Sequence, residues 1–296
     1  MPKQVPPPDP NPRKPNLRLP AGAVDSHIHL FGPSSQYAFH PDSRYVSEDA
    51  LPETYIAMQE VLGLTRAVVV SGGGYGPDFR HLSAVLERFP ERFRGVALLP
   101  ETASAAEIRN LDRLGVRGAR FHSPKHGGSI PELSKQTASK IADQGWHVQF
   151  YPYRGDLVEY ADQLMDLPNV IVLDHFASVP AEEGVDHPSF QTLLRMLDSG
   201  RVWVKLSGPM RCFQGDPPYA CVTPMAQALV RHAPERLVWG TDWPHVNMTG
   251  RVMPNDGDLV DLLAEWVPDP ETRHRILVAN PCELYGFEPP AAAGQG

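Results

Sequence analysis

Short apolar runs alternate with longer amphipathic stretches over most of this 296-residue chain. The runs are rich in valine, isoleucine, leucine and aromatic residues, which favour strands, and the stretches between them show helical spacing. We expect strands at residues 23–29, 66–71, 93–99, 116–122, 147–151, 170–175, 202–207 and 237–242. We expect helices at residues 51–62, 79–88, 105–114, 132–144, 156–164, 188–197, 223–232 and 259–266.

Eight strands that alternate with helices predict a parallel sheet with right-handed crossovers. Eight is the number that closes a barrel, and a chain of about 250 residues is enough for one. The main alternative, a doubly wound open sheet, usually has a glycine-rich phosphate loop after its first strand. Here the first strand runs into HIHLFGP instead, and the glycines at 72–74 lack the Lys-Ser/Thr of a P-loop. We therefore predict an α/β fold, a single-domain (β/α)8 TIM barrel.

The two ends of the chain differ from this pattern. Eight prolines fall within residues 1–20, which predicts an extended, polyproline-like arm. We expect this arm either to be disordered or to lie across a neighbouring subunit. Residues 21–288 would form the barrel, and residues 289–296 (PPAAAGQG) would form a disordered tail.

Composition excludes some classes of partner. A net charge of −8 offers no basic excess for a phosphate backbone, which argues against nucleic acid. There is no apolar stretch of about 18 residues for a membrane span and no secretory signal. The irregular spacing of Cys212, Cys221 and Cys282 predicts reduced thiols. We expect a cytoplasmic protein with no membrane partner, and a homo-oligomer remains open.

Polar residues recur where the predicted strands end. The C-terminal ends of barrel strands meet at one rim, so these side chains should share a pocket. They are Asp25, His27 and His29 on the first strand, Arg120 and His122 on the fourth, Tyr151 on the fifth, Asp174 and His175 on the sixth, Lys205 and Ser207 on the seventh, and Asp242 with His245 at the eighth.

The His-x-His pair and the last aspartate suggest chemistry. His27 and His29 are two residues apart on a strand, so both point to the same face. Two imidazoles on one face suit a divalent metal or a hydrogen bond to a carbonyl oxygen. Asp242 is placed to take a proton from an attacking water. The alternatives are two core or surface histidines, and an aspartate that merely shapes the turn before Trp243.

At this point the residues resemble a known family. The strings Val-Asp-Ser-His-Ile-His at 24–29, Leu-Asp-His at 173–175 and Trp-Gly-Thr-Asp-Trp-Pro-His at 239–245 resemble the amidohydrolase superfamily. Within it, the chain is similar to the branch that contains the 2-pyrone-4,6-dicarboxylate lactonases. Further matching stretches lie at 31–33, 43–45, 117–121, 145–148 and 280–281, so the resemblance covers residues 22–287.

The resemblance implies a hydrolase that opens a small carboxylated lactone from aromatic-ring breakdown. Asp242 would be the base that activates water. His27, His29 and His175 would polarise the lactone carbonyl, either directly or through a metal. The positions that would contact substrate are Tyr45, Arg120, Tyr151, Arg211 and His245. Arginine suits this role because it binds a carboxylate through two parallel hydrogen bonds.

Two departures from that branch bear on the substrate. Its members carry a further arginine a few residues beyond Arg120, where this chain has Lys125 and His126. They carry another shortly after the sixth-strand histidine, where this chain reads Phe-Ala-Ser-Val at 176–179. Lys125 could bind substrate and replace the charge of a guanidinium but not its forked geometry. A related lactone, such as a muconolactone with one carboxylate or a sulfonate, therefore also fits.

The cofactor has two alternatives. Binuclear superfamily members bridge their metals with a carboxylated lysine or a glutamate, and the fourth and fifth strand ends here offer only Arg120, His122 and Tyr151. One zinc ion held by His27, His29, His175 and Asp242 is one possibility. The other is a site without metal, in which protonated histidines and an arginine stabilise the oxyanion.

Three other functions remain open beside the lactonase. Related barrels with the same histidines and aspartate include mononuclear-zinc decarboxylases, which would release CO2. A sugar-acid lactone isomerase would convert one lactone into another without releasing acid. A binding protein without catalysis would need the histidines and the aspartate to be structural.

Overall fold

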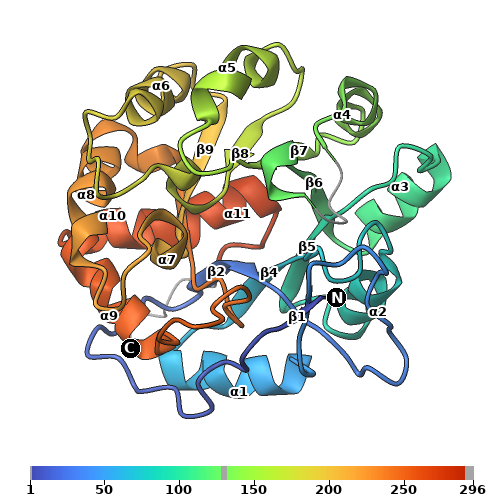
Figure 1. Cartoon of the computed structure of the whole chain (residues 1–296), viewed down its shortest axis with the longest axis horizontal. Coiled ribbons are helices and arrows are strands. Elements are labelled where there is room, and N and C mark those ends of the chain that lie inside the picture. Colours follow the sequence, from blue (N-terminus) through green and yellow to red (C-terminus); the bar gives the residue numbers. More distant parts are fainter. Residues whose placement is uncertain (1, 128–131, 291–296) are drawn as a thin grey trace.

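The computed structural model describes residues 2–127 and 132–290. Within these ranges, eight parallel strands form one sheet, and Figure 1 shows the helices arranged around it. The strands are β2 (Val24–Ile28), β4 (Arg66–Val70), β5 (Phe93–Ala97), β6 (Val116–His122), β7 (His147–Tyr151), β8 (Ile171–Leu173), β9 (Val202–Ser207) and β10 (Leu237–Gly240). The order of the strands in the sheet is the order of this list, from β2 to β10.

The first and last strands close the sheet into a ring. The backbone N–H of Asp242 donates to the carbonyl of His27 at 2.9 Å, and the N–H of His29 donates to the carbonyl of Trp243 at 2.7 Å. A parallel bridge joins Ile28 to Trp243 at the same point. The predicted (β/α)8 barrel is confirmed, and its seam brings the His-x-His pair beside the last aspartate.

Each expected helix is present, with small shifts at its ends. The helices are α1 (Pro52–Leu62), α2 (Arg80–Arg88), α3 (Ala105–Arg113), α4 (Lys135–Ala142), α5 (Leu157–Met165), α6 (Pro188–Leu197), α8 (Thr223–His232) and α9 (Asp256–Trp266). Three more were not expected, namely α7 (Pro209–Cys212), α10 (Pro270–His274) and α11 (Asn280–Tyr285). In α11 the Asn-Pro pair looks like a helix break, but proline is tolerated in the first turn of a helix.

Five strands, β2, β4, β5, β8 and β10, end one or two residues earlier than the apolar pattern suggested, and two of these ends bear on the site. The sixth was expected to reach His175, but β8 ends at Leu173, and residues 175–178 all have positive φ. The eighth was expected to reach Asp242, which also has a positive φ, of 69°. His175 and Asp242 therefore lie in turns just beyond the ends of β8 and β10, where the backbone no longer follows the strand conformation.

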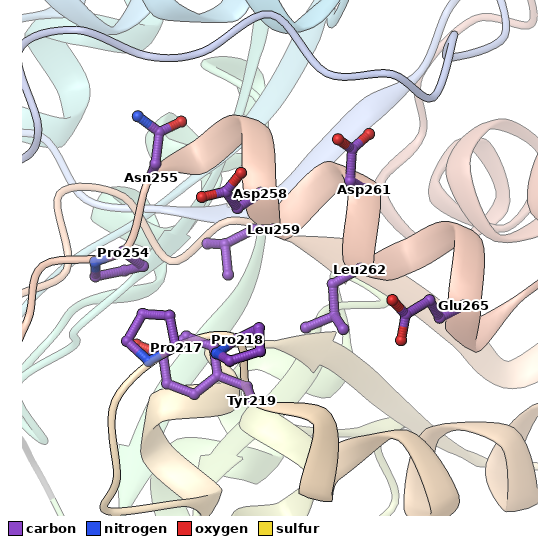
Figure 2. Close-up of a pocket in the computed structure, with 10 residues that line it drawn as sticks. All are labelled: Pro217, Pro218, Tyr219, Pro254, Asn255, Asp258, Leu259, Asp261, Leu262 and Glu265. Carbon is purple, nitrogen blue, oxygen red and sulfur yellow. The ribbon is translucent and has the colours of Figure 1, made fainter.

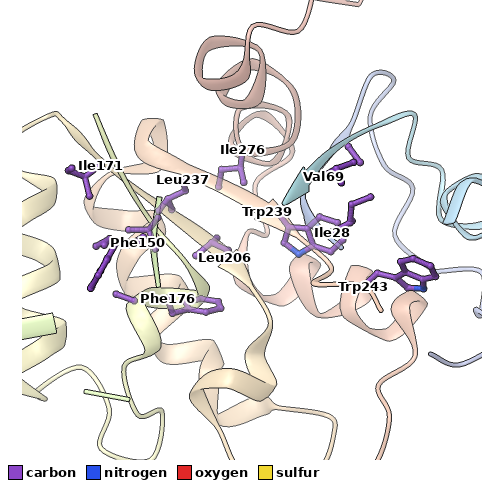
Figure 3. Close-up of a cluster of buried hydrophobic side chains, with 14 of the residues drawn as sticks. Ile28, Val69, Phe150, Ile171, Phe176, Leu206, Leu237, Trp239, Trp243 and Ile276 are labelled. Atoms are coloured by element: carbon purple, nitrogen blue, oxygen red, sulfur yellow. The ribbon is translucent and has the colours of Figure 1, made fainter. Parts of the chain in front are cut away.

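The core fills the space inside the strands and between strands and helices. Figure 3 shows part of it, with Phe150, Leu206 and Trp239 among the labelled side chains. All three are at most 1% exposed. Because parallel barrel strands are covered on both faces, their sequences are almost continuously apolar, as the runs in this chain are. The few polar side chains inside the barrel therefore require a specific explanation.

The proline-rich segment lies against the barrel of its own chain. The two-residue strand β1 (Lys3–Gln4) pairs in parallel with β3 (Tyr45–Val46). Arg13 forms ion pairs with Asp258 and Asp261 of α9, at 2.6 and 2.5 Å. Most of the tail expected at 289–296 lies outside the described residues. The three cysteines, all within the described ranges, are free thiols. Among the described helices, none has the length and apolarity that a membrane span requires.

Candidate active site

The four residues predicted to carry the chemistry meet at the C-terminal end of the barrel. The Nε2 atoms of His27, His29 and His175 lie 3.8, 3.7 and 3.8 Å from Oδ1 of Asp242. The Nε2 atoms of His27 and His29 are 3.4 Å apart. All four residues are at most 3% exposed. The structure thus brings together residues that are more than 200 positions apart in the sequence.

Acceptors behind the rings fix the orientation of two histidines. Nδ1 of His29 lies 2.7 Å from the carbonyl oxygen of Val70, which can only accept, so this nitrogen carries the proton. Nδ1 of His175 lies 3.0 Å from Oγ of Ser207. The lone pair of His29 Nε2 therefore faces Asp242, and the serine hydroxyl can hold His175 in the same tautomer.

A buried carboxylate holds the third histidine. Oδ1 of Asp174 lies 3.3 Å from Nδ1 of His27, while Nε and Nη2 of Arg120 are each 3.0 Å from Oδ2. Nζ of Lys205 is 3.8 Å from Oδ1. Burial acts to raise the pKa of Asp174, but Arg120, His27 and Lys205 outweigh it and hold that pKa well below its ordinary value. Asp174 therefore stays ionised and orients His27.

Burial also determines the charge of the histidines. It lowers the pKa of His29 to about 3 and that of His175 to about 4, and it brings the pKa of His27 well below its ordinary value. All three imidazoles are thus neutral at neutral pH. This argues against the protonated histidine cluster that the sequence left open, and it favours imidazoles that accept hydrogen bonds or bind a metal.

Asp242 is ionised for a different reason. Nε and Nη2 of Arg211 lie 2.8 and 2.7 Å from its Oδ2. Burial acts to raise the pKa of Asp242, but the positive charge of Arg211 outweighs burial, so the pKa of Asp242 lies well below its ordinary value. The result is a buried carboxylate with one oxygen bound by an arginine and the other, Oδ1, directed at three imidazole nitrogens.

The predicted substrate contacts fall into two groups. Arg120 lies over the ring of Tyr151 at 5.3 Å, and burial raises the pKa values of Tyr45 and Tyr151 to about 12. Arg120, Arg211 and Asp242 all act electrostatically on Tyr45 and Tyr151. Both phenols thus remain protonated donors beside the cluster of His27, His29, His175 and Asp242.

Lys125 and His245 are occupied elsewhere. Nζ of Lys125 lies 2.7 Å from Oε1 of Glu159, and its side chain is 44% exposed. Nε2 of His245 lies 3.0 Å from Oδ1 of Asp256, and both residues are buried. Their contacts with substrate therefore stay predictions.

Lys205 was noticed in the sequence but given no role. Its Nζ lies 2.9 Å from the carbonyl of Ser26 and 2.8 Å from Oε1 of Gln149, and the residue is fully buried. Burial lowers the pKa of Lys205 to about 7. The sequence does contain a sign of this arrangement, because Lys205 and Gln149 are polar residues within the otherwise apolar strands VWVKLS and HVQFY. Together with Asp174 they form a polar layer beneath His27.

The donor set can be tested against a metal ion. In a tetrahedral site with ligand distances of about 2.0–2.1 Å, neighbouring ligand atoms lie about 3.3–3.4 Å apart. The His27–His29 distance of 3.4 Å matches this, and the distances of 3.7–3.8 Å to Asp242 are slightly wider. The ligand atoms of His27, His175 and Asp242 lie within 4.8 Å of one another. The site therefore fits one divalent ion.

A cavity of about 290 Å³ adjoins the site at Arg211 and Tyr151. Its remaining walls come from the segments that follow β6, β7, β8, β9 and β10. They are His126, Tyr153, Arg154, Ser178, Met210, Gln214, Asn247 and Arg251. A small organic molecule fits such a volume. The cavity borders the cluster through Arg211, which binds Asp242, and through Tyr151, whose ring centroid lies 5.1 Å from that of His175.

Comparison with known proteins identifies the family. A family model described as amidohydrolase matches residues 24–287. The chain belongs to the amidohydrolase family. This confirms the resemblance drawn from the three histidine and aspartate motifs. Amidohydrolases often use a metal, and the cluster of His27, His175 and Asp242 is a possible place for one.

Relatives cover almost the whole of this amidohydrolase. A 2-pyrone-4,6-dicarboxylate hydrolase of Comamonas testosteroni is 37% identical, with 93% of each chain covered. A 4-sulfomuconolactone hydrolase of Hydrogenophaga intermedia is 34% identical, with 90% of each chain covered. A D-galactarolactone isomerase of Agrobacterium fabrum is 30% identical, covering 93% of this chain and 94% of the isomerase.

A solved structure agrees with the barrel. The crystal structure of an Agrobacterium tumefaciens protein in its apo form superposes with a TM-score of 0.83 at 29% sequence identity. The match covers 93% of this chain and 99% of the other. The family and the fold are therefore consistent across independent comparisons.

Proposed function

We propose that this amidohydrolase is a lactonase that opens a small acidic lactone by attack of water on the ring carbonyl. The observation that carries the proposal is the convergence of three neutral imidazole nitrogens on Oδ1 of an ionised Asp242. The relatives support it, because two of them are hydrolases of lactones that carry carboxylate or sulfonate groups in their names.

In this proposal Asp242 acts as the general base. A water molecule near Oδ1 gives its proton to the carboxylate while its oxygen forms a bond to the lactone carbonyl carbon. The ring C–O bond then breaks, and the departing oxygen takes up a proton to give the open acid. Arg211 stays on Oδ2 and keeps Oδ1 free for this step.

The negative charge that develops on the lactone carbonyl oxygen during the attack requires hydrogen-bond donors. Tyr45 and Tyr151 are protonated phenols with pKa values of about 12, and Arg120 lies against Tyr151. These groups are suited to hold the oxyanion and the substrate carboxylate, because they donate from a site with little water. The neutral histidines can accept hydrogen bonds from the attacking water and orient it.

A metal would use the same four side chains. His27, His29, His175 and Asp242 would hold a single divalent ion such as Zn²⁺, and the ion would polarise the lactone carbonyl. The proposal therefore includes one ion at most. Asp242 remains the residue that accepts the proton, and Arg211 remains the residue that positions it.

An isomerase is the second candidate, because the D-galactarolactone isomerase is 30% identical over nearly the whole chain. The same base could remove a proton from a sugar hydroxyl, which would then attack the lactone carbonyl within the same molecule. Such a reaction consumes one lactone and produces another. It releases no acid, which separates it from hydrolysis.

The test measures acid release from a panel of lactones. The purified protein is incubated with 2-pyrone-4,6-dicarboxylate, 4-sulfomuconolactone and D-galactarolactone, and acid is titrated at constant pH. We expect one equivalent of acid per lactone opened, with kcat reduced at least about 1,000-fold in Asp242→Asn. Asp143→Asn, at an exposed helix end, serves as the matched control and should be unaffected.

Each other outcome has a distinct meaning. Loss of lactone without acid release, with a second lactone as product, supports the isomerase. Release of CO2 supports the decarboxylase considered from the sequence. A panel that stays intact, or an Asp242→Asn protein as active as the native one, contradicts the proposed lactonase.

A further inference from the structure

The N-terminal segment, residues 3–17, is fixed at one end to the strand β3. The backbone N–H of Lys3 donates to the carbonyl of Arg44 at 2.9 Å. The N–H of Val5 donates to the carbonyl of Val46 at 3.0 Å. The side chain of Val5 is packed as well, because the residue is 2% exposed and belongs to the hydrophobic core. This end of the segment is therefore held to the barrel by its backbone and by a buried side chain.

The strand β3 carries Tyr45, which is one of the predicted substrate contacts. Its hydroxyl lies close to the catalytic cluster, because a Cβ at Gly72 would meet that hydroxyl at 2.9 Å and Nδ1 of His29 at 3.4 Å. In the parallel ladder Lys3 is the partner of Tyr45, so the N-terminal segment lies directly beside this residue. Movement of β3 would therefore move the hydroxyl of Tyr45 relative to His29.

The other end of the segment forms part of the helix cap of α9. Nδ2 of Asn255 donates to Oδ2 of Asp9 at 2.8 Å and to the carbonyl of Asn11 at 3.0 Å. Oδ1 of Asn255 accepts from the N–H of Arg13 at 2.9 Å, and it caps the helix by accepting from the N–H of Gly257 at 3.0 Å. Both polar atoms of the capping side chain thus contact the segment, so the cap and the segment hold each other in place.

From this cap, contacts continue to the catalytic aspartate. Oδ1 of Asp256, the residue after Asn255, lies 3.0 Å from Nε2 of His245, and both residues are buried. The backbone N–H of His245 donates to the carbonyl of Asp242 at 2.9 Å. His245 is also a predicted substrate contact. The N-terminal segment therefore supports two such residues, Tyr45 through β3 and His245 through α9.

The first turns of α9 lie between this segment and a pocket. Figure 2 shows the pocket, which has a volume of about 340 Å³ and separates α9 from residues 217–219. Toward the segment the packing is tight, because a Cβ at Gly257 would overlap the carbonyl oxygen of Arg13. Arg13 also forms its ion pairs with Asp258 and Asp261 here. The segment is therefore the closer of these two neighbours of the helix end.

We propose that residues 3–17 act as a positioning strap, which holds Tyr45 and His245 at the lactone through β3 and α9. The inference rests on the proposed lactonase, since both residues are predicted to contact its substrate. Val5 and Arg13 are the positioning residues at the two ends of the strap. They act through Tyr45 and His245, because a small displacement of a substrate-binding group is enough to slow a reaction.

The test releases each end of the strap separately. Val5→Pro removes the N–H that donates to Val46. Gly257→Ala places a methyl group against the carbonyl of Arg13, while alanine favours the helix and keeps α9 stable. In both variants we expect kcat/KM for the lactone that the native protein opens to fall about tenfold. Gly257→Ala carries the test if Val5→Pro does not fold.

Double variants separate positioning from a loss of stability. If Val5 acts through Tyr45, Val5→Pro should lower kcat/KM less than about twofold further in a Tyr45→Phe protein. Gly257→Ala should likewise add less than about twofold in a His245→Gln protein. A general loss of stability would instead multiply the two losses, because independent effects add as free energies.

The controls change exposed side chains of the strap and keep its backbone contacts. They are Gln4→Ala beside Val5 and Lys14→Gln beside Arg13. Both proteins should keep kcat and KM within about twofold of the native values. A larger loss in either control would show that any change in the segment lowers activity, and it would overturn the assignment of Val5 and Arg13.

The possible failures are distinguishable. If the native protein opens a lactone and the strap variants stay within about twofold of it, or lose the same factor in the double variants, the inference is overturned while the proposed lactonase stands. If no lactone is opened, the proposed function fails, and hydrogen exchange decides the inference alone. Amide exchange at residues 44–46 that is at least about tenfold faster in Val5→Pro than in the native protein, with β6 unchanged, supports the strap. Equal exchange overturns it.

Discussion

Arg211 binds Asp242 through two nitrogens that share one carboxylate oxygen. Nε lies 2.8 Å and Nη2 2.7 Å from Oδ2. The second oxygen, Oδ1, is thereby left to the three histidines. One oxygen of this carboxylate is therefore held in position, and the other is available for chemistry. The contact also links α7 to the turn that follows β10.

Replacing Arg211 should change how activity depends on pH. Because Arg211 lowers the pKa of Asp242, its removal raises that pKa. A base is active only above its own pKa, so the acidic limb of the kcat profile should move to higher pH in Arg211→Met. Arg211→Lys keeps the charge but loses the two-nitrogen contact, and we expect kcat to fall about 100-fold. Profiles measured from pH 4 to 9 that superpose on the native curve would contradict this role.

Gly208 is the residue that lets Arg211 and Asp242 meet. Its φ is +54°, and a Cβ there would lie 2.8 Å from Nδ1 of His175 and 3.1 Å from Oδ2 of Asp242. Gly208→Ala should therefore displace both side chains and lower kcat at least about 100-fold. The substitution adds left-handed backbone strain of about 1 kcal/mol as well.

A matched control separates strain from displacement. Gly63, at the end of α1, also has positive φ, of +81°, but a Cβ there meets nothing within 4 Å. Gly63→Ala should destabilise the protein by about 1 kcal/mol in denaturant unfolding and leave kcat unchanged. Equal losses of activity in Gly208→Ala and Gly63→Ala would show that contact with the catalytic pair is not the cause.

The barrel could be predicted because its strands are covered on both faces. VRGARFH, HVQFY and VWVKLS were expected at the residues where β6, β7 and β9 lie. The catalytic cluster followed from the same pattern, since parallel strands end on one rim. His27, His29, His175 and Asp242 could therefore be grouped from sequence alone, and the structure brings Nε2 of each histidine within 4 Å of Oδ1 of Asp242.

The wall of the cavity could not be predicted in this way. Arg154, Ser178 and Arg251 lie in three loops, and loop conformation depends on contacts such as those from Arg251 to the carbonyls of residues 210, 213 and 215. No periodic pattern encodes such contacts. The same holds for Lys125, whose pairing with Glu159 depends on how a short turn meets α5.

Metal binding should saturate at one ion per chain. The described donors around Asp242 are three imidazoles and one free carboxylate oxygen, and no second carboxylate bridges them. Calorimetric titration with Zn²⁺ should therefore give a stoichiometry of at most one, and His27→Gln should weaken the interaction at least about tenfold. His232→Gln, outside the barrel on α8, is the control. Two equivalents of tightly bound zinc would contradict the single-ion site.

Because buried histidines are neutral in the folded protein, the free energy of unfolding should decrease as the pH is lowered over a defined range. The pKa of His175 is about 4 in the folded protein and ordinarily 6.5, so it contributes its full stability above pH 6.5. Below that, the unfolded chain binds a proton that the folded protein does not, and stability falls by about 1.4 kcal/mol per pH unit until pH 4. Asp242, whose pKa is lowered, loses its contribution only as the pH falls through the ordinary range of carboxyl groups, near pH 4 and below.

The interval from pH 7 to 5 covers most of this change, and the comparison with a His175 variant separates it from Asp25 and Lys205, whose pKa values of about 6 and about 7 fall in or at the edge of the same interval. Over it, His175 alone should cost the native protein about 2 kcal/mol of unfolding free energy, measured by urea denaturation with a chelator present. His175→Gln cannot take up this proton, so its stability should fall by about 2 kcal/mol less over the same interval. Parallel curves for His175→Gln and the native protein would mean that His175 is already protonated in the fold, and the oxyanion would then have a cationic imidazole beside it.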